Sequence, residues 1–216
     1  MSIEHIRRDY TQRTLARSNL QNNPILQFQE WFDTTLTSDC GTDPTAMVLA
    51  TCAENKPTQR IVLLKGFSEN GFIFYTNYNS VKGQQLQANP NCSIHFAWLP
   101  QERQIHIEGV AEKLTEAENT TYFQSRPRAS QLGAWASSQS QPIASRIELD
   151  QQLADIESRF AGQDTLPLPP FWGGFRIIPN SIEFWQGRSG RLHDRFRYQR
   201  QATEQGSEWH LERLQP

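Results

Sequence analysis

The sequence predicts a mostly β protein, with an antiparallel β-barrel as its single domain and helices at its periphery. Many short apolar or alternating segments follow one another, and several are joined by tight turns rather than by helical crossovers. The 216 residues contain no internal repeat and no low-complexity linker, so one domain is expected. Residues 1–20 are polar with few apolar anchors, and we expect a flexible N-terminal arm before a domain at 21–216.

Four helices are predicted where a capping residue precedes apolar residues at helical spacing. Asn23 and Pro24 begin the first, whose apolar face consists of Ile25, Phe28, Phe32 and Leu36. The others are expected at 80–88, at 115–125 behind a capping box that Thr115 opens, and after Ser145, with Leu149, Leu153, Ile156 and Phe160 as a stripe.

Strands are predicted from apolar runs, alternation and the turn residues between them. Turns are expected at 54–57, 68–71 and 99–101. The predicted strands are 46–53, 60–67, 72–76, 94–98, 105–107, 174–178, 181–186, 195–198 and 208–214.

Composition argues against several classes of partner. The net charge is −2, which lacks the basic field of generic nucleic-acid binding, and no apolar run approaches the ~20 residues of a membrane span. Cys40, Cys52 and Cys92 have no metal-ligand spacing, so we expect no metal. Unpaired cysteines fit a reducing compartment, and the cytoplasm is the expected location. Motifs of Rossmann, P-loop, zinc-peptidase and serine-hydrolase sites are absent.

Two segments offer cations beside an apolar strand or a helix start. Residues two apart in a strand share a face, so Arg60 and Lys65 lie on opposite faces of the 60–65 segment, where they could hold a phosphate. The alternative is that they are ordinary charged strand ends. Tyr75 and Thr76 precede a helix start that contains Lys82, a favourable place for an anion, although simple helix capping explains the same residues.

Tyr122, Arg126 and Ser130 recur at helical spacing and would share one helix face. Pro127 disfavours helix at Arg126, but a helix break there can still direct all three side chains at one phosphate. Surface decoration at a helix junction is the alternative.

The most informative segment is Arg191-Leu192-His193-Asp194-Arg195, just after Glu183-Phe184-Trp185-Gln186-Gly187. If a strand begins here, Arg191, His193 and Arg195 share one face. Three such groups together are unfavourable unless an anion or an electron-rich ring lies among them, which favours a ligand site over a structural role.

At these residues the chain resembles the pyridoxamine 5'-phosphate oxidase family, from about Arg7 to Pro216. The motifs RxVLLK, YTN, SxK, YFxSRPRxSQxGAW, QS, FWGGFR, EFWQG and RLHDR occur in the family's order. The resemblance implies an FMN-binding split β-barrel and a homodimer with FMN at the subunit interface. It also implies oxidation of pyridoxamine or pyridoxine 5'-phosphate by O2 to pyridoxal 5'-phosphate in vitamin B6 metabolism, with release of hydrogen peroxide, and of ammonia from the amine.

The resemblance further implies roles for individual residues. The implied FMN contacts are Arg60, Ile61, Val62, Leu63, Leu64, Lys65, Tyr75, Thr76, Lys82, Gln104, Gln139, Ser140, Trp185 and Arg195. The implied substrate contacts are Arg7, Tyr10, Lys65, Tyr122, Arg126, Ser130, Arg191, Leu192 and His193. Of these, Arg191 and His193 are the implied catalytic pair over the substrate ring.

One position departs from the family pattern. The family commonly has arginine between the serine and lysine of the SxK motif, where this chain has Val81. A lost charge-assisted bond to the FMN phosphate corresponds to about 1.5–3 kcal/mol if buried. Two rival functions share the fold expectation: a non-catalytic flavin carrier, and a flavin reductase that uses a nicotinamide.

Overall fold

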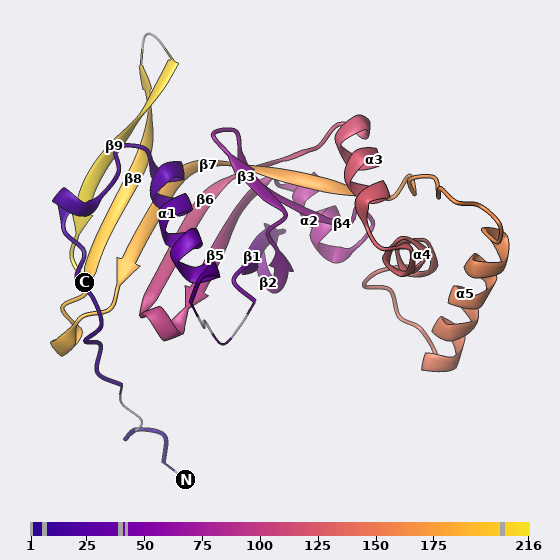
Figure 1. Ribbon diagram of the computed structural model, residues 1–216, viewed down its shortest axis with the longest axis horizontal. Coiled ribbons are helices and arrows are strands. Elements are labelled where there is room, and N and C mark those ends of the chain that lie inside the picture. The colour runs from indigo at the N-terminus through magenta and orange to yellow at the C-terminus, as the bar shows by residue number, and fades with distance from the viewer. Residues whose placement is uncertain (1, 6–7, 39–40, 42, 204–205) are drawn as a thin grey trace.

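The computed structural model describes residues 2–5, 8–38, 41, 43–203 and 206–216. Within these ranges it contains nine strands, five α-helices and three short 3-10 segments (Figure 1). The strands are β1 (Ala46–Ala53), β2 (Lys56–Leu63), β3 (Gly66–Ser68), β4 (Gly71–Asn77), β5 (Asn91–Trp98), β6 (Arg103–Lys113), β7 (Trp172–Gln186), β8 (Asp194–Thr203) and β9 (Gly206–Leu214). The α-helices are α1 (Pro24–Leu36), α2 (Val81–Ala88), α3 (Glu116–Ser125), α4 (Arg128–Ala136) and α5 (Arg146–Arg159), and the 3-10 segments are η1 (Arg17–Asn19), η2 (Leu99–Gln101) and η3 (Ser189–Arg191).

The strand pairs are antiparallel, as predicted, in the order β2-β1-β5-β6-β7-β4-β3. The two strands at the ends of this order, β2 and β3, are separated in the chain only by Leu64 and Lys65. The sheet must therefore curl until its ends approach each other, which produces the barrel. The backbone N–H of Lys65 donates to the carbonyl of Ile73 at 2.8 Å and fastens this junction.

Strand β7 splits the barrel. One edge pairs with β6, while the other edge pairs first with β4 and then with β8, which continues into β9. Figure 1 shows β8 and β9 standing beside the far end of β7. The prediction of two strands, 174–178 and 181–186, was wrong in that they form one strand. The shifted register at Glu108 and Gly109 of β6 leaves Asn180 as an extra residue and so accommodates the irregular middle of β7.

The predicted strand 60–67 also differs from the structure. It is divided into β2 and β3, and β2 begins earlier, at Lys56. The turn consists of Glu54 and Asn55 alone, both with positive φ (51° and 60°), as a two-residue hairpin turn requires. Lys56 and Pro57 therefore pair with β1. Pro57 is tolerated because β2 is an end strand in the pairing order.

Helix α1 is confirmed, with the Asn23 side chain accepting the N–H of Ile25. Its Phe28 is completely buried in the barrel core. The ring centroid of Phe28 lies 4.8 Å from that of Phe67, 4.9 Å from Phe72 and 5.2 Å from Phe96. One aromatic side chain thus joins α1 to β3, β4 and β5.

A second apolar cluster lies among α3, α4, α5 and the start of β7, and consists of Phe123, Leu132, Phe160, Leu166 and Trp172. The capping box of α3 and the Ser145 cap of α5 are confirmed. Helix α4 was not predicted, because its N-cap is Pro127, which makes no side-chain cap bond. Figure 1 shows α4 and α5 at the opposite end of the molecule from β8 and β9.

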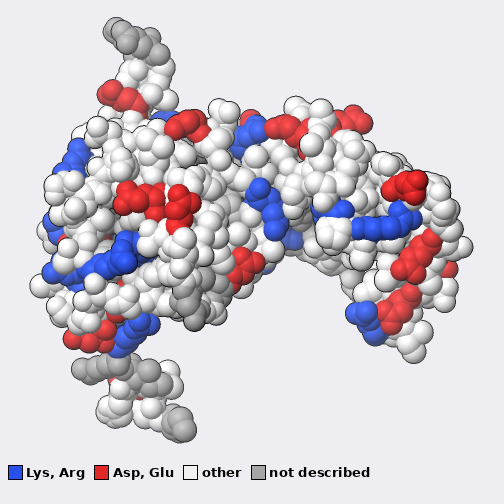
Figure 2. All heavy atoms as spheres, in the orientation of Figure 1, with Lys and Arg blue, Asp and Glu red and all other residues white. Residues whose placement is uncertain are grey.

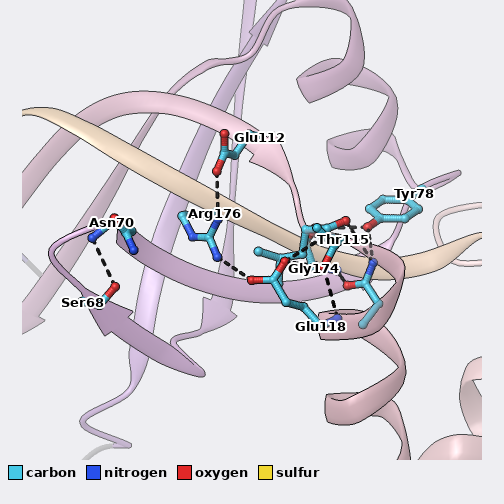
Figure 3. Close-up of polar contacts among 10 residues, drawn as sticks. Ser68, Asn70, Tyr78, Glu112, Thr115, Glu118, Gly174 and Arg176 are labelled. Atoms are coloured by element: carbon cyan, nitrogen blue, oxygen red, sulfur yellow. Dashed lines mark hydrogen bonds and ion pairs between the residues drawn. The ribbon is translucent and has the colours of Figure 1, made fainter.

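Arg176 of β7 fastens α3 to the sheet (Figure 3). Its Nη1 donates to Glu112 of β6 at 2.9 Å, and its Nη2 donates to Glu118 of α3 at 2.6 Å. Glu118 also closes the capping box with Thr115. Because one carboxylate serves both contacts, the start of the helix that carries Tyr122 is held in place.

Acidic and basic side chains are interspersed over the face shown in Figure 2, which agrees with the small net charge. The same view shows the molecule hollowed between the body of the sheet and the helical lobe at the right. Among the described residues, no helix is long and apolar enough to cross a membrane.

Truncating Phe28 should destabilise the barrel strongly. Phe28→Ala removes a fully buried ring, and we expect the free energy of unfolding to fall by about 3–5 kcal/mol. Leu26→Ala is the matched control, because Leu26 is on the same helix but 55% exposed, and its effect should stay below about 1 kcal/mol. Urea unfolding of both variants checks this, and equal midpoints would contradict it.

Candidate functional site

One cavity of about 720 Å³, here named the cationic cavity, gathers most of the residues predicted to bind phosphate groups. Its walls come from β2, β4, α2, α3, α4, the segment after α4 and the first residue of β7. The predicted residues that line it are Arg60, Ile61, Val62, Leu63, Lys65, Tyr75, Thr76, Lys82, Tyr122, Arg126, Ser130, Gln139 and Ser140. Leu64 does not line it, because its side chain is buried in the barrel core.

Arg60 is held by uncharged oxygen atoms. Its Nη1 donates to the Thr51 hydroxyl at 2.6 Å, and its Nη2 donates to the Thr58 hydroxyl at 2.6 Å and to the Gln85 amide oxygen at 3.3 Å. Burial lowers the pKa of the guanidinium. These contacts orient Arg60 but leave its charge uncompensated, as an anion site requires.

Lys82 extends from α2 toward Thr76 and Gln139. Its Nζ donates to the Gln139 amide oxygen at 3.0 Å and to the Thr76 hydroxyl at 3.3 Å, and Thr76 donates to the same amide oxygen at 3.0 Å. Burial, and then the charge of Arg60, lower the pKa of Lys82. Thr76 and Lys82 are therefore brought together with Gln139, which is more than fifty residues away in sequence.

The helix break at Arg126 is confirmed. Helix α3 ends at Ser125, Arg126 has extended backbone angles, and α4 begins after Pro127. The guanidinium lies over the ring of Trp172, 4.7 Å from its centroid, and burial lowers its pKa. Its Nη1 is buried and has no hydrogen-bond partner within the described part of the chain.

Tyr122 forms part of an aromatic stack at the cavity wall. Its ring lies on that of Tyr75, with centroids 3.7 Å apart and planes 12° apart, and the Trp172 ring lies nearly parallel to both, 5.3 Å from Tyr75 and 6.2 Å from Tyr122. Burial is the main cause that raises the pKa of Tyr75 to about 12, so its hydroxyl stays protonated at neutral pH. The stack fixes Tyr122 beside Arg126.

The charges of the cationic cavity are unbalanced. Arg60, Lys65, Lys82 and Arg126 line it, and none of its described lining residues is Asp or Glu. Like charges in a partly buried space are unfavourable unless an anion joins them. Together with the unpartnered N–H of Arg126, this donor set fits phosphate groups.

A second group of predicted residues lies along β6, β7 and β8. Gln104, Trp185 and Arg195 line a smaller cavity of about 240 Å³. Arg195 is held by Glu183, with Nε to Oε1 at 2.7 Å and Nη2 to Oε2 at 3.0 Å. This bidentate pair raises the pKa of Arg195 and fixes its orientation.

His193 contacts this second group through Trp185, with ring centroids 4.5 Å apart, and Tyr10 packs edge-on against both rings. The Nδ1 of His193 accepts the backbone N–H of Arg188 at 3.1 Å. Burial, and then Arg191 and Arg195, lower its pKa, so the ring is neutral at pH 7. Its proton therefore resides on Nε2.

The predicted start of a strand through Arg191, His193 and Arg195 was wrong for Arg191 and His193, which both precede the strand. Arg191 ends the 3-10 segment η3 with φ of 64°, and β8 begins only at Asp194. Arg191 and Leu192 are exposed. Arg7 of the predicted arm lies outside the described residues.

The two groups of predicted residues are far apart within one chain. Tyr75 pairs with Gly174 of β7, whereas Gln104 pairs with Trp185, eleven residues further along the same strand. At about 3.3 Å per residue, that separation is roughly 35 Å. One chain alone does not place both groups around the same ring system.

Sequence reasoning missed the residues that hold the predicted ones. Thr51, Thr58 and Gln85 orient Arg60, and Glu183 orients Arg195. Strand pairing and the packing of α2 against β1 bring them together, and these tertiary contacts leave no local signal. Trp172 stood inside the FWGGFR motif, but its contact with Arg126 could not be inferred from spacing.

Comparison with known proteins gives a consistent result over the chain. Residues 37–160 match the family described as pyridoxamine 5'-phosphate oxidase. Residues 172–216 match the family described as pyridoxine 5'-phosphate oxidase C-terminal dimerisation region. The second match covers β7, β8 and β9 and includes Trp185, His193 and Arg195.

Among curated proteins, the chain is 53% identical to the pyridoxine/pyridoxamine 5'-phosphate oxidase of Hahella chejuensis, with all of both chains covered. It is 51% identical to the protein of the same name from Acaryochloris marina, covering all of this chain and 96% of that one. Among solved structures, PhzG from Burkholderia lata, in complex with tetrahydrophenazine-1-carboxylic acid, is 30% identical with a TM-score of 0.82, covering 92% of this chain and 95% of that one. An FMN-binding protein from Nostoc punctiforme, related to pyridoxamine 5'-phosphate oxidase, shares the fold with a TM-score of 0.67 at 18% identity, covering 88% and 97%.

Removing one cation from the cavity should stabilise the ligand-free protein. Because burial lowers the pKa of folded Lys82, its charged form destabilises the fold below that pKa, and the penalty vanishes as pH rises through it toward the ordinary 10.5. At pH 7 we expect Lys82→Met to raise the melting temperature by about 2 °C. Inorganic phosphate should protect wild type more than the variant.

The exposed Lys56 of β2 supplies the matched control, since Lys56→Met removes a charge away from the cavity. A lower melting temperature for Lys82→Met than for wild type, with phosphate protection unchanged, would contradict the assignment of the cavity as an anion site.

Proposed function

The chain belongs to the pyridoxamine 5'-phosphate oxidase family, and we propose the following roles for its residues in the oxidation of pyridoxamine or pyridoxine 5'-phosphate to pyridoxal 5'-phosphate. The reaction uses FMN and O2 and releases hydrogen peroxide, with ammonia from the amine substrate. The observation that carries the assignment of roles is the cationic cavity, which offers four cations and, among its described lining residues, no carboxylate.

Two pairs of cations divide the cavity between two phosphates. Arg60 and Lys82, with Thr76, Gln139 and Ser140, are assigned to the FMN phosphate, since the mutual contacts of Lys82, Thr76 and Gln139 form one hydrogen-bonded group. Tyr122, Arg126 and Ser130, with Lys65, are assigned to the substrate phosphate. Nη1 of Arg126, which is buried without a hydrogen-bond partner among the residues that the structure describes, supports this second assignment. Bound FMN supplies the redox chemistry, accepting two electrons from the substrate and delivering them to O2.

The second group of residues, along β6, β7 and β8, is assigned to the site whose cationic cavity belongs to the other subunit. A homodimer, with FMN between the subunits, would bring Gln104, Trp185 and Arg195 of one chain over the cationic cavity of the other. The match of 172–216 to a dimerisation region supports this arrangement. It also accounts for the roughly 35 Å that separates the two groups along β7 in one chain.

His193 and Arg191 are assigned to the substrate ring. Neutral His193 presents an N–H at Nε2, while its Nδ1 is occupied by Arg188, so it can donate a hydrogen bond and hold the ring. Arg191 is exposed next to it and supplies a cation. The arm at 1–20, with Arg7 and Tyr10, is assigned to closing over this site, which the contacts of Tyr10 with Trp185 and His193 support.

The cytoplasm is the proposed location, supported by the free thiols of Cys52 and Cys92. A flavin carrier would need only the first pair of cations, so the second cradle at Arg126 favours the oxidase. A nicotinamide-dependent reductase would require a second cofactor for turnover, which the oxidase does not.

Aerobic turnover without NAD(P)H tests the function and the roles together. Wild type with FMN and pyridoxamine 5'-phosphate should form aldehyde and hydrogen peroxide. We expect Arg126→Ala to raise KM about 10–100-fold, because it removes a charge-assisted contact to the phosphate. Arg191→Ala should mainly lower kcat.

Arg146→Ala provides the control, since Arg146 is exposed on α5 and pairs only with Asp150 among the described residues. Its kcat and KM should match wild type. Absence of product in air from wild type, or unchanged kinetics of both site variants, would reject the proposal.

Restoring the family's arginine should strengthen FMN binding. Val81 is 43% exposed at the start of α2 and precedes Lys82, which lines the cavity, so Val81→Arg adds a solvated cation next to a lining residue. We expect the dissociation constant of FMN to fall about threefold to tenfold. This change is smaller than a buried contact would cause, because solvent screens the exposed side chain. Fluorescence quenching of FMN measures this, with Val81→Leu as an uncharged control that should leave affinity unchanged.

A further inference from the structure

A row of ionisable side chains crosses the sheet next to the proposed flavin contact Arg195. Strand register places His95 of β5 opposite His106 of β6, His106 opposite Glu183 of β7, and Glu183 opposite Arg197 of β8. Opposed residues in antiparallel strands share a face. The imidazole centroids of His95 and His106 are 6.0 Å apart, and both rings line the small cavity that contains Glu183 and Arg195.

Glu183 is the carboxylate on which this row converges. Its backbone partner Arg197 is engaged by Glu212 of β9, at 2.9 Å from Nε and 2.6 Å from Nη2. Glu183 is therefore left to Arg195, which it binds through both carboxylate oxygens. Its side chain is only 16% exposed, so little water is present to screen a competing cation.

The groups that face the histidine pair are few among the described residues. Glu108 of β6 lies 3.4 Å from Nε2 of His106, Glu183 and Arg195 complete the cavity, and β1 contributes the apolar Val48 opposite His95. A proton on either imidazole creates a second cation beside the carboxylate that holds Arg195. Burial, and then His106, lower the pKa of His95, whereas Glu183 raises it, so the proton and Arg195 compete for the same partner.

We infer that His95 and His106 are positioning residues that act on Arg195 through Glu183, and that they make cofactor binding weaken as the pair gains a proton. The inference rests on the proposed function, in which Arg195 contacts FMN. While both imidazoles are neutral, Glu183 holds Arg195 undisturbed. A proton gained by the pair draws on Glu183 and adds positive charge next to the guanidinium.

The dissociation constant of FMN for the flavin-free protein, measured by fluorescence quenching at pH 5.5 and pH 7.5, tests this. The two-pH ratio is the dissociation constant at pH 5.5 divided by the dissociation constant at pH 7.5. The FMN phosphate itself titrates near pH 6, but this contribution is common to every variant and cancels when the ratios of two variants are compared. We expect the wild-type ratio to exceed that of His95→Leu/His106→Leu about fivefold or more. His210→Leu, which removes an exposed histidine of β9, should keep the wild-type ratio.

Glu183→Gln separates a positioning role from a merely structural one. It should weaken FMN binding about tenfold at pH 7.5, and its two-pH ratio should equal that of the double variant, because the shared carboxylate is gone. If the double variant keeps the wild-type ratio, or if Glu183→Gln binds FMN as wild type does at both pH values, the inference is overturned.

Histidine titration by NMR in the flavin-free protein tests the coupling without any cofactor. Arg195→Ala frees Glu183, so the pKa of at least one of His95 and His106 should rise by about half a unit or more, while His210 stays unchanged. Unchanged pKa values of the pair overturn the inference whatever the flavin result. If the pair does shift but wild type takes up no FMN at any pH, the proposed function is what fails, and the role of the pair in cofactor binding falls with it.

Discussion

Uncompensated positive charge in the cationic cavity is the constraint on which the rest of the structure depends. The chain carries more acidic than basic residues, 23 against 21, so a space with four cations and no carboxylate among its described lining residues does not follow from composition. Elsewhere, Arg176, Arg188, Arg195 and Arg197 each form an ion pair, whereas the buried Arg103 of β6 donates to the uncharged Gln186. The uncompensated cations of the cavity lower the stability of the fold, and an anionic ligand can restore it.

The barrel supplies the rigidity that this arrangement needs. Arg60 and Lys65 sit at either end of a segment that passes from β2 to the start of β3, and the closure of the barrel fixes their separation. Arg126 is positioned differently, by the break between α3 and α4 at Pro127. Helix α3 is anchored to the sheet by the ion pair between Arg176 and Glu118. The cations thus belong to separate elements, and a phosphate bound among them would tie the helical lobe to the sheet.

The sequence predicted most of the fold where local signals were strong. The Asn23 cap, the capping box at Thr115 and the alternation in β5 and β6 each specify an element without help from distant residues. The sequence-based prediction failed where tertiary contacts determine the structure. Strand β7 is continuous because β6 shifts register beside it. Helix α4 forms without a side-chain cap because its apolar face packs on the second cluster. Candidate residues of the site were predicted from motif order, but the partners that orient them follow from tertiary structure that no local pattern encodes. Glu183 is placed by the pairing of β7 with β8, and Gln85 by the packing of α2 against β1.

The separation along β7 explains why a second subunit would be intrinsic to the site rather than an addition to it. Arg195 is already satisfied by Glu183 in the single chain, so it is rigid before any cofactor arrives, and Trp185 is fixed by His193 and Tyr10. A preorganised surface loses little conformational entropy when it meets its ligand. Each subunit would then present one preorganised surface to its partner's cavity, and the same salt bridge that makes Arg195 rigid makes it sensitive to any proton that competes for Glu183.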